Sequence, residues 1–78
     1  MDIKEQVIEI VATELGVDKE MVTPTASFTN DLGADSLDVT DMIIAFESKF
    51  EIEIPDEDFE RISNVEEAVA YLSAKLGK

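Results

Sequence analysis

Apolar side chains recur at spacings of three and four residues in three separate stretches of this chain. The recurring positions are Ile3, Val7, Ile10, Val11 and Leu15 in the first stretch, Val39, Met42, Ile43, Phe46 and Phe50 in the second, and Val65, Ala68, Val69, Leu72 and Leu76 in the third. Because an α-helix turns once every 3.6 residues, this spacing places apolar side chains along one helix face. The pattern predicts amphipathic helices over residues 3–15, 36–50 and 65–76, packed around a common core.

Residues that cap helices stand at the expected ends of these segments. The pairs at the N-terminal ends are Asp2 with Glu5, Asp35 with Asp38, and Asn64 with Glu67, each three residues apart. In such a pair the first side chain accepts a hydrogen bond from a backbone N–H of the first helical turn. Gly16 is placed to end the first helix in a left-handed conformation.

The periodicity lapses between the first two helices. Residues 17–34 contain Thr23-Pro24-Thr25 and several turn-forming residues, which indicate a long loop. We expect apolar side chains of this loop to anchor it to the core. The expected anchors are Met21, Val22, Phe28 and Leu32.

A different irregular segment follows Phe50. Residues 51–54 alternate acidic and apolar side chains, but no second segment offers a strand to pair with them, so we expect an extended connector. Pro55 then begins a short helix that runs to Ile62. The chain is thus predicted to be all-α, a small antiparallel bundle of three long helices and one short helix with a long loop between the first two. Its 78 residues suffice for a single domain, residues 1–78.

Ser36 is the residue that the second helix presents at its start. With Asp35 as the cap and Asp38 at the third helical position, Ser36 occupies the first helical position and faces solvent. A phosphate ester there would lie beside unpaired backbone N–H groups and the positive end of the helix dipole. The carboxylates of Asp35 and Asp38 would repel it. Local geometry therefore favours a phosphate at Ser36, whereas local charge opposes it.

Two apolar residues remain on the polar side of the second helix. Leu37 and Ile44 lie two turns apart, and their neighbours on that side are Ser36, Thr40, Asp41, Glu47 and Ser48. Isolated exposed apolar side chains need no explanation, and scattered exposure is the alternative here. Two aligned ones beside acids and a presented serine favour a small docking face.

The charge of the chain restricts its partners. It has 19 acidic and 6 basic residues and no histidine, which gives a formal net charge of −13. Nucleic acid and anionic membrane surfaces are therefore poor partners, and basic proteins are the expected ones. The opening residues lack a signal peptide and no apolar run reaches about 18 residues, so we expect a cytoplasmic protein without stable membrane insertion. We also expect a monomer.

Catalysis and dedicated metal binding are both disfavoured. Without histidine or cysteine the chain has no common general base near neutral pH and no thiol nucleophile, so we expect no enzyme. A calcium loop starting at Asp31 would place Gly33, Ser36 and Met42 at its third, sixth and twelfth positions, which does not fit an EF-hand. We expect no metal site. Weak divalent-ion binding by acids such as Glu47, Glu51, Glu53 and Asp56 would only relieve charge.

The combination of these segments resembles the acyl carrier proteins, of the free-standing kind that serves dissociated, bacterial-type fatty acid synthesis. The resemblance covers nearly all of the chain. It is carried by Leu32-Gly33-Ala34-Asp35-Ser36-Leu37-Asp38, the helix 36–50, Glu53-Ile54-Pro55-Asp56 and the segment 65–72 with its closing Tyr71-Leu72. The Gly-x-Asp-Ser-Leu motif is short by itself and becomes specific with the Ile-Pro-Asp turn at its proper distance.

The resemblance implies a function and a set of site residues. Ser36, flanked by Asp35 and Leu37, would receive 4′-phosphopantetheine from coenzyme A through a phosphopantetheinyl transferase, and acyl groups would be carried on its thiol as thioesters. The positions that would dock on basic patches of fatty acid synthesis enzymes are Asp35, Leu37, Asp38, Asp41, Ile44 and Glu47. The positions that would line an interior pocket for the acyl chain are Phe28, Phe46, Ile54, Ile62, Ala68 and Leu72.

Some positions depart from the family pattern, and two alternatives stay open. Thr40, Asp41, Phe46 and Ser48 stand where relatives often carry other side chains. Asp35 favours an acyl carrier over a peptidyl carrier, and a helix start directly after Met1 favours a free-standing protein. The alternatives are a carrier for another acyl pathway, such as polyketide, lipid A or lipoate precursors, and an acidic protein-interaction module that carries nothing.

Overall fold

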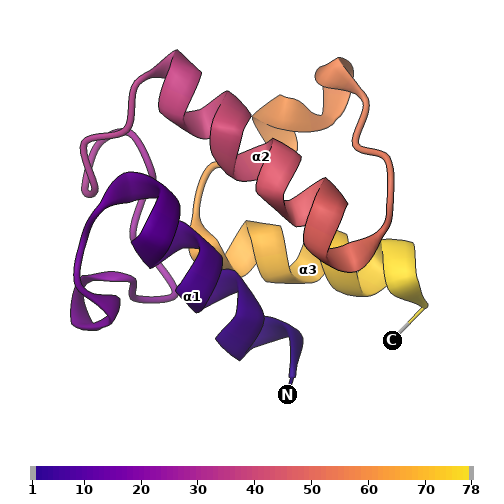
Figure 1. Ribbon diagram of the computed structural model, residues 1–78, viewed down its shortest axis with the longest axis horizontal. Coiled ribbons are helices and arrows are strands. Elements are labelled where there is room, and N and C mark those ends of the chain that lie inside the picture. The colour runs from indigo at the N-terminus through magenta and orange to yellow at the C-terminus, as the bar shows by residue number, and fades with distance from the viewer. Residues whose placement is uncertain (1, 78) are drawn as a thin grey trace.

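The computed structural model describes residues 2–77 and contains three α-helices and two short 3₁₀ helices within them (Figure 1). In chain order these are α1 (Ile3–Leu15), η1 (Lys19–Met21), α2 (Ser36–Phe50), η2 (Asp56–Arg61) and α3 (Val65–Leu76). The bounds of the three long helices confirm the predicted ones. The predicted short helix after Pro55 is present as the 3₁₀ helix η2, and η1 was not predicted.

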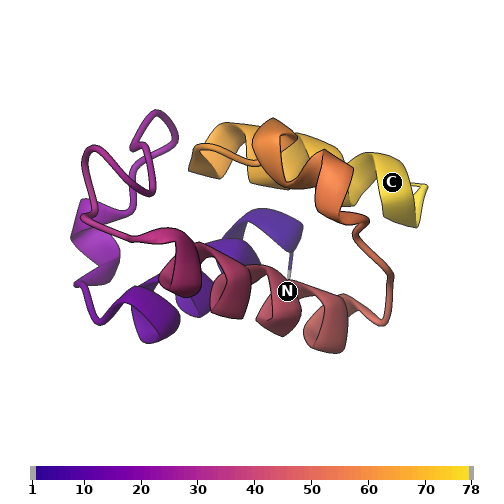
Figure 2. The same cartoon turned by 90° about the horizontal axis from the view of Figure 1, so that it is seen from above.

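Helix α1 contacts both of the other long helices. It packs against both α2 and α3, whereas α2 and α3 approach each other closely at few positions. The chain direction in α1 is opposite to that in α2, as predicted for an antiparallel bundle (Figure 1). Figure 2 shows η2 and α3 on one side of the molecule and α2 on the other. The space between these two sides is therefore bridged mainly by side chains.

The interior of the described residues is apolar throughout. No polar or charged residue among residues 2–77 is buried. The predicted faces of all three helices point inward, and about half of their positions are fully buried. The half-buried positions of these faces are Ile3, Ile10, Leu15, Val39, Phe50, Val69 and Leu76. The buried residues are Val7, Val11, Val22, Ala26, Phe28, Leu32, Ala34, Met42, Ile43, Phe46, Ile54, Ile62, Val65, Ala68 and Leu72.

One predicted anchor of the long loop is wrong. Met21 is 50% exposed, whereas the adjacent Val22 is only 3% exposed. Met21 lies in η1, whose tight turn buries none of its own side chains, and the chain reaches the core one residue later. Val22, Phe28 and Leu32 are buried as predicted.

The helix caps follow the predicted pattern. The side chain of Asp2 accepts a hydrogen bond from the Glu5 N–H at 2.8 Å, and that of Asn64 accepts one from the Glu67 N–H at 2.8 Å. Gly16 ends α1 with φ of 67°, the left-handed conformation expected of it. Within residues 2–77, no helix is long and apolar enough to cross a membrane.

Glu51, at the end of α2, adopts a conformation that the sequence pattern did not indicate. It has φ of 55° and ψ of 50°, so a residue with a side chain occupies the left-handed region that normally favours glycine. The turn carries the chain back toward the core, where Glu47 Oε2 accepts a hydrogen bond from the Ile54 N–H at 2.9 Å.

We expect Glu51→Gly to raise the free energy of unfolding by about 0.5–1 kcal/mol, because glycine removes the left-handed strain at some cost in chain entropy. Urea denaturation followed by circular dichroism measures this difference. Glu53→Gly is the matched control, because Glu53 is also exposed and its substitution removes the same charge from a segment without regular secondary structure. A Glu51→Gly variant that is no more stable than Glu53→Gly would contradict the strain at this position.

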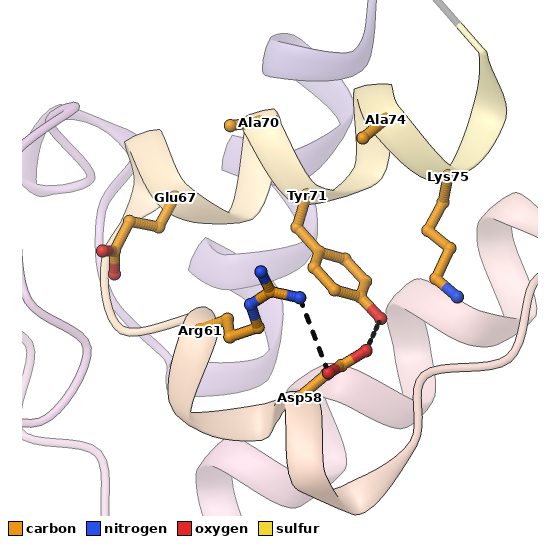
Figure 3. Close-up of a pocket in the computed structure, with 7 residues that line it drawn as sticks. All are labelled: Asp58, Arg61, Glu67, Ala70, Tyr71, Ala74 and Lys75. Atoms are coloured by element: carbon orange, nitrogen blue, oxygen red, sulfur yellow. Dashed lines mark hydrogen bonds and ion pairs between the residues drawn. The ribbon is translucent and has the colours of Figure 1, made fainter.

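Tyr71 joins α3 to η2 through its hydroxyl. The hydroxyl donates a hydrogen bond to Asp58 Oδ2 at 2.6 Å, and Lys75 Nζ lies 5.7 Å from the centre of the tyrosine ring (Figure 3). Burial, the hydrogen bond to Asp58 and the negative charge of Asp58 together raise the pKa of Tyr71 from 10.0 to about 12. The neutral phenol is thus the form that the folded chain favours.

Titration of Tyr71 tests this bond directly, because the chain has one tyrosine and no tryptophan. We expect the ultraviolet absorbance of the phenolate to appear with a midpoint near pH 12 instead of 10. A pKa raised in the folded state stabilises the fold below pH 10, and this contribution is lost as the pH rises from 10 through 12. Tyr71→Phe should lose stability less steeply in that range, and a midpoint near 10 in the folded wild type would refute the bond.

Candidate functional site

The loop before α2 holds the start of that helix in place. Phe28, Leu32 and Ala34 are buried, and the Ala34 N–H donates to the Phe28 carbonyl at 2.8 Å. Between the last two anchors, Gly33 has φ of 73°, a conformation strained for any residue with a side chain. The glycine turn and the buried alanine fix the direction in which the chain enters α2.

Hydrogen bonds also join the same loop to the start of α3 and to the residues just before it. The Phe28 N–H donates to the Ser63 carbonyl at 3.1 Å, and the Glu66 N–H donates to the Pro24 carbonyl at 2.9 Å. An isolated antiparallel bridge pairs Ser27 with Asn64. These bonds join residues far apart in the chain, which explains why the hydrophobic pattern alone indicated only a loop.

A reciprocal pair of hydrogen bonds starts α2. The Asp38 N–H donates to Asp35 Oδ1 at 2.9 Å, and the Asp35 N–H donates to Asp38 Oδ2 at 3.3 Å. This confirms the predicted capping box. Both carboxylates accept hydrogen bonds from the backbone, so they fix the helix start in addition to carrying charge.

Ser36 is the first residue of α2 and is exposed. Its backbone carbonyl accepts a hydrogen bond from Thr40 Oγ1 at 2.9 Å. Its hydroxyl has no hydrogen-bond partner among residues 2–77, so no base in this part of the chain activates it. The first intrahelical backbone bond runs from the Val39 N–H to the Asp35 carbonyl at 3.0 Å, which leaves the N–H groups of Ser36 and Leu37 facing the helix start.

This geometry fits an attached phosphodiester and does not fit a nucleophilic serine. The exposed hydroxyl is accessible to another protein, and the adjacent N–H groups at the helix start favour a phosphate oxygen. The cap carboxylates of Asp35 and Asp38 oppose it by charge, which matters less for a covalently held group than for a bound ion. Ser36 is therefore suited to be modified by an external enzyme.

Four of the six predicted docking positions are exposed at the start or along the outer side of α2, and Asp38 and Glu47 are the exceptions. Leu37 is 74% exposed and Ile44 is 54% exposed. Asp35 and Asp41 are exposed, whereas Asp38 and Glu47 are half-buried. Glu47 Oε2 accepts the hydrogen bond from the Ile54 N–H, a structural role that the sequence pattern did not reveal.

The six predicted pocket positions lie together in the core. Each of them is at most 4% exposed, and all belong to one buried cluster. They come from the loop, α2, the segment around η2, and α3: Phe28, Phe46, Ile54, Ile62, Ala68 and Leu72. In the structure these side chains pack against other apolar residues. An acyl chain among them would require the core to rearrange.

The acids of the connector do not converge on a point. Within residues 2–77, no group of three or more histidine, cysteine, aspartate or glutamate side chains is arranged to hold a metal ion. Weak binding of divalent cations by the acidic surface remains a prediction.

Comparison with known proteins identifies the family. The family described as "Phosphopantetheine attachment site" matches residues 5–72, a range that includes the capping box, Ser36 and α2. The acyl carrier protein of Chloroherpeton thalassium (strain ATCC 35110 / GB-78) is 51% identical over 74 residues, which are 95% of this chain and 92% of that protein. The chain therefore belongs to the acyl carrier protein family and contains a phosphopantetheine attachment domain.

Proposed function

We propose that Ser36 is the residue that carries 4′-phosphopantetheine, attached through a phosphodiester by a phosphopantetheinyl transferase that uses coenzyme A as the donor. The observation that supports this most directly is the exposed hydroxyl of Ser36, held at the first position of α2 and without a hydrogen-bond partner among residues 2–77. Asp35 and Leu37 flank the attachment point, and the capping box keeps it in a constant orientation.

The protein is a carrier and not an enzyme. The terminal thiol of the attached group holds an acyl chain as a thioester, a chemistry that the chain itself lacks because it has no cysteine. The chain's own residues present the attachment point and interact with enzymes. We propose that the cargo is the growing acyl chain of fatty acid synthesis, handled by a monomeric carrier in the cytoplasm.

The exposed side of α2 is the proposed docking face for the transferase and for fatty acid synthesis enzymes with basic patches. Its apolar part is Leu37 and Ile44, whose exposure on an otherwise polar surface favours contact with a partner. Its acidic part consists of the exposed Asp35 and Asp41 and the half-buried Asp38 and Glu47. With a net charge of −13 behind it, this face attracts basic surfaces over a distance.

The core is the proposed shelter for the acyl chain. Burial of each methylene group is favourable by about 0.8 kcal/mol, so a long acyl chain gains substantially by entering an apolar interior. The six buried positions Phe28, Phe46, Ile54, Ile62, Ala68 and Leu72 are proposed to move apart around it. Ala68, the smallest of them, lies on α3 where a larger side chain would occupy that space.

Loading by a phosphopantetheinyl transferase and coenzyme A should add about 340 Da to the protein, the mass of one phosphopantetheine group. Intact-protein mass spectrometry detects the addition, and peptide fragmentation assigns it to Ser36. Ser36→Ala should prevent it, while Ser48→Ala, which changes another exposed serine of α2, should load as the wild type does. A wild-type chain that stays unmodified, or a Ser36→Ala variant that is loaded, would overturn the proposal.

Docking should depend on both the apolar and the acidic parts of α2. We expect Leu37→Ala to lower the transferase's kcat/KM about tenfold, since an exposed apolar anchor is lost without damage to the core. Asp41→Asn should lower it about threefold at about 0.05 M salt and by less at about 0.5 M, because salt screens exposed charges.

The control for this charge dependence is Glu66→Gln, which removes one exposed acid from the start of α3 instead of α2. It should load at nearly the wild-type rate at both salt concentrations. Equal effects of Asp41→Asn and Glu66→Gln would mean that only net charge matters, and the proposed face on α2 would then be wrong.

A further inference from the structure

The 3₁₀ helix η2 is held to the rest of the protein by few buried contacts of its own. No residue of η2 is buried, and no side chain caps its start. Phe59 is half-buried and packs at the edge of the core. The buried residues nearest to η2 are Ile54 before it, 4% exposed, and Ile62 after it, 1% exposed. The middle of η2 is thus bound less tightly than the residues on either side.

One side-chain hydrogen bond joins this middle part to α3. Asp58 lies in η2, its side chain is 19% exposed, and it accepts the 2.6 Å hydrogen bond from the Tyr71 hydroxyl (Figure 3). Arg61 lies 3.8 Å from Asp58, but its own side chain is 72% exposed, so this ion pair contributes little. Beyond η2, the Ser63 hydroxyl and N–H both donate to Glu67, which fixes the segment that follows.

An open groove next to the Asp58–Tyr71 hydrogen bond allows this bond to break and form again. The groove has a volume of about 500 Å³ and is lined by Asp58, Arg61, Tyr71 and Lys75, among others. When the bond breaks, water in the groove can solvate the Asp58 carboxylate and the tyrosine hydroxyl. Movement of η2 away from α3 therefore does not leave a buried charge without a partner. An unpaired buried charge would make the free-energy cost of this movement prohibitive.

The residues beside this bond belong to the proposed acyl shelter. Leu72 follows Tyr71 directly on α3, and Ile54 and Ile62 flank η2; all three belong to the buried cluster. Because η2 packs on α3 and α3 has few close approaches to α2, movement of η2 away from α3 would open the core at these residues. Figure 2 shows that η2 and α3 lie opposite α2 across the interior.

We propose that Asp58 and Tyr71 determine which acyl chains the interior accepts, because their hydrogen bond sets how readily η2 moves away from α3. This inference rests on the proposed carrier function. The free energy gained by sheltering an acyl chain increases with each methylene that is buried. The free-energy cost of displacing η2 is the same for every acyl-chain length. Shelter therefore becomes favourable above a threshold length, and the Asp58–Tyr71 bond contributes to that threshold.

The first test measures opening of η2 in the unmodified chain. Amide hydrogen exchange is compared for the wild type, Tyr71→Phe and Arg61→Gln. Tyr71→Phe keeps the ring and removes only the hydroxyl, and it should speed the exchange of η2 amides about tenfold relative to any change in α1. Arg61→Gln, the matched control, removes the exposed ion-pair partner and should leave η2 exchange nearly unchanged.

The second test measures the shelter without any enzyme. Ser36→Cys introduces the sole thiol of the chain, to which pantetheine arms ending in butanoyl, hexanoyl, octanoyl or decanoyl amides are attached chemically. A sheltered acyl chain raises the Tm of the protein above that of the protein that carries pantetheine without an acyl group. In the Tyr71→Phe background this gain should begin at an acyl chain shorter by about two methylenes, since their burial is comparable to one hydrogen bond to a charged group.

The outcomes separate this inference from the proposed function. Unchanged η2 exchange in Tyr71→Phe, equal acceleration in η2 and α1, or the same threshold length in both backgrounds would each overturn it. A protein whose Tm does not rise with any attached acyl group would overturn both the proposed acyl shelter and this inference. Neither test uses a transferase, so failure of enzymatic loading at Ser36 would count against the proposed function alone.

Discussion

A small apolar core holds together a surface whose charges repel one another, and most other features of the structure follow from this constraint. The buried side chains of residues 2–77 are all hydrophobic, while the chain as a whole carries a net charge of −13. Repulsion at this charge opposes the compact state, so burial must offset both repulsion and lost chain entropy. Several acids also stabilise the fold, because they accept hydrogen bonds from the backbone near helix ends and turns or, in the case of Asp58, from the Tyr71 hydroxyl. These acceptors are Asp2, Asp31, Asp35, Asp38, Glu47, Asp58 and Glu67.

Features set by neighbouring residues could be predicted from the sequence, and features set by distant ones could not. The three long helices, the capping box and Gly16 were predicted correctly, because periodicity and caps depend on residues at most a few positions apart. The bonds between the long loop and residues 63–66, and the bond between Asp58 and Tyr71, connect segments whose proximity exists only in the fold. Met21 was expected to be buried because it is apolar. Its place in the short turn η1 exposes it, and Val22 occupies the core instead.

The same distinction applies to the site. The exposed position of Ser36 could be predicted from the sequence because it follows from the cap that precedes it, and the exposure of Leu37 and Ile44 follows from the phase of the helix. Glu47 was expected only as an acid on the docking face. Its carboxylate also accepts the Ile54 N–H, and no helix pattern predicts a bond to a segment seven residues further on that has no regular structure. The burial of the six pocket positions agrees with an interior location, while their role as a shelter depends on a rearrangement of that interior.

The two ends of α2 meet opposite requirements of a carrier. At its start, the capping box, the buried Ala34 and the loop bonded to Ser63 fix the direction of Ser36. Beyond its end, η2 has no buried residue and is joined to α3 by one side-chain bond at its middle. An enzyme that recognises α2 needs a constant geometry around the serine, whatever the length of the cargo. A core that admits cargo must yield somewhere, and in a fold this small any yielding part lies close to the docking face. Because α1 packs on both α2 and α3, the proposed movement of η2 would leave the helix that presents Ser36 in place.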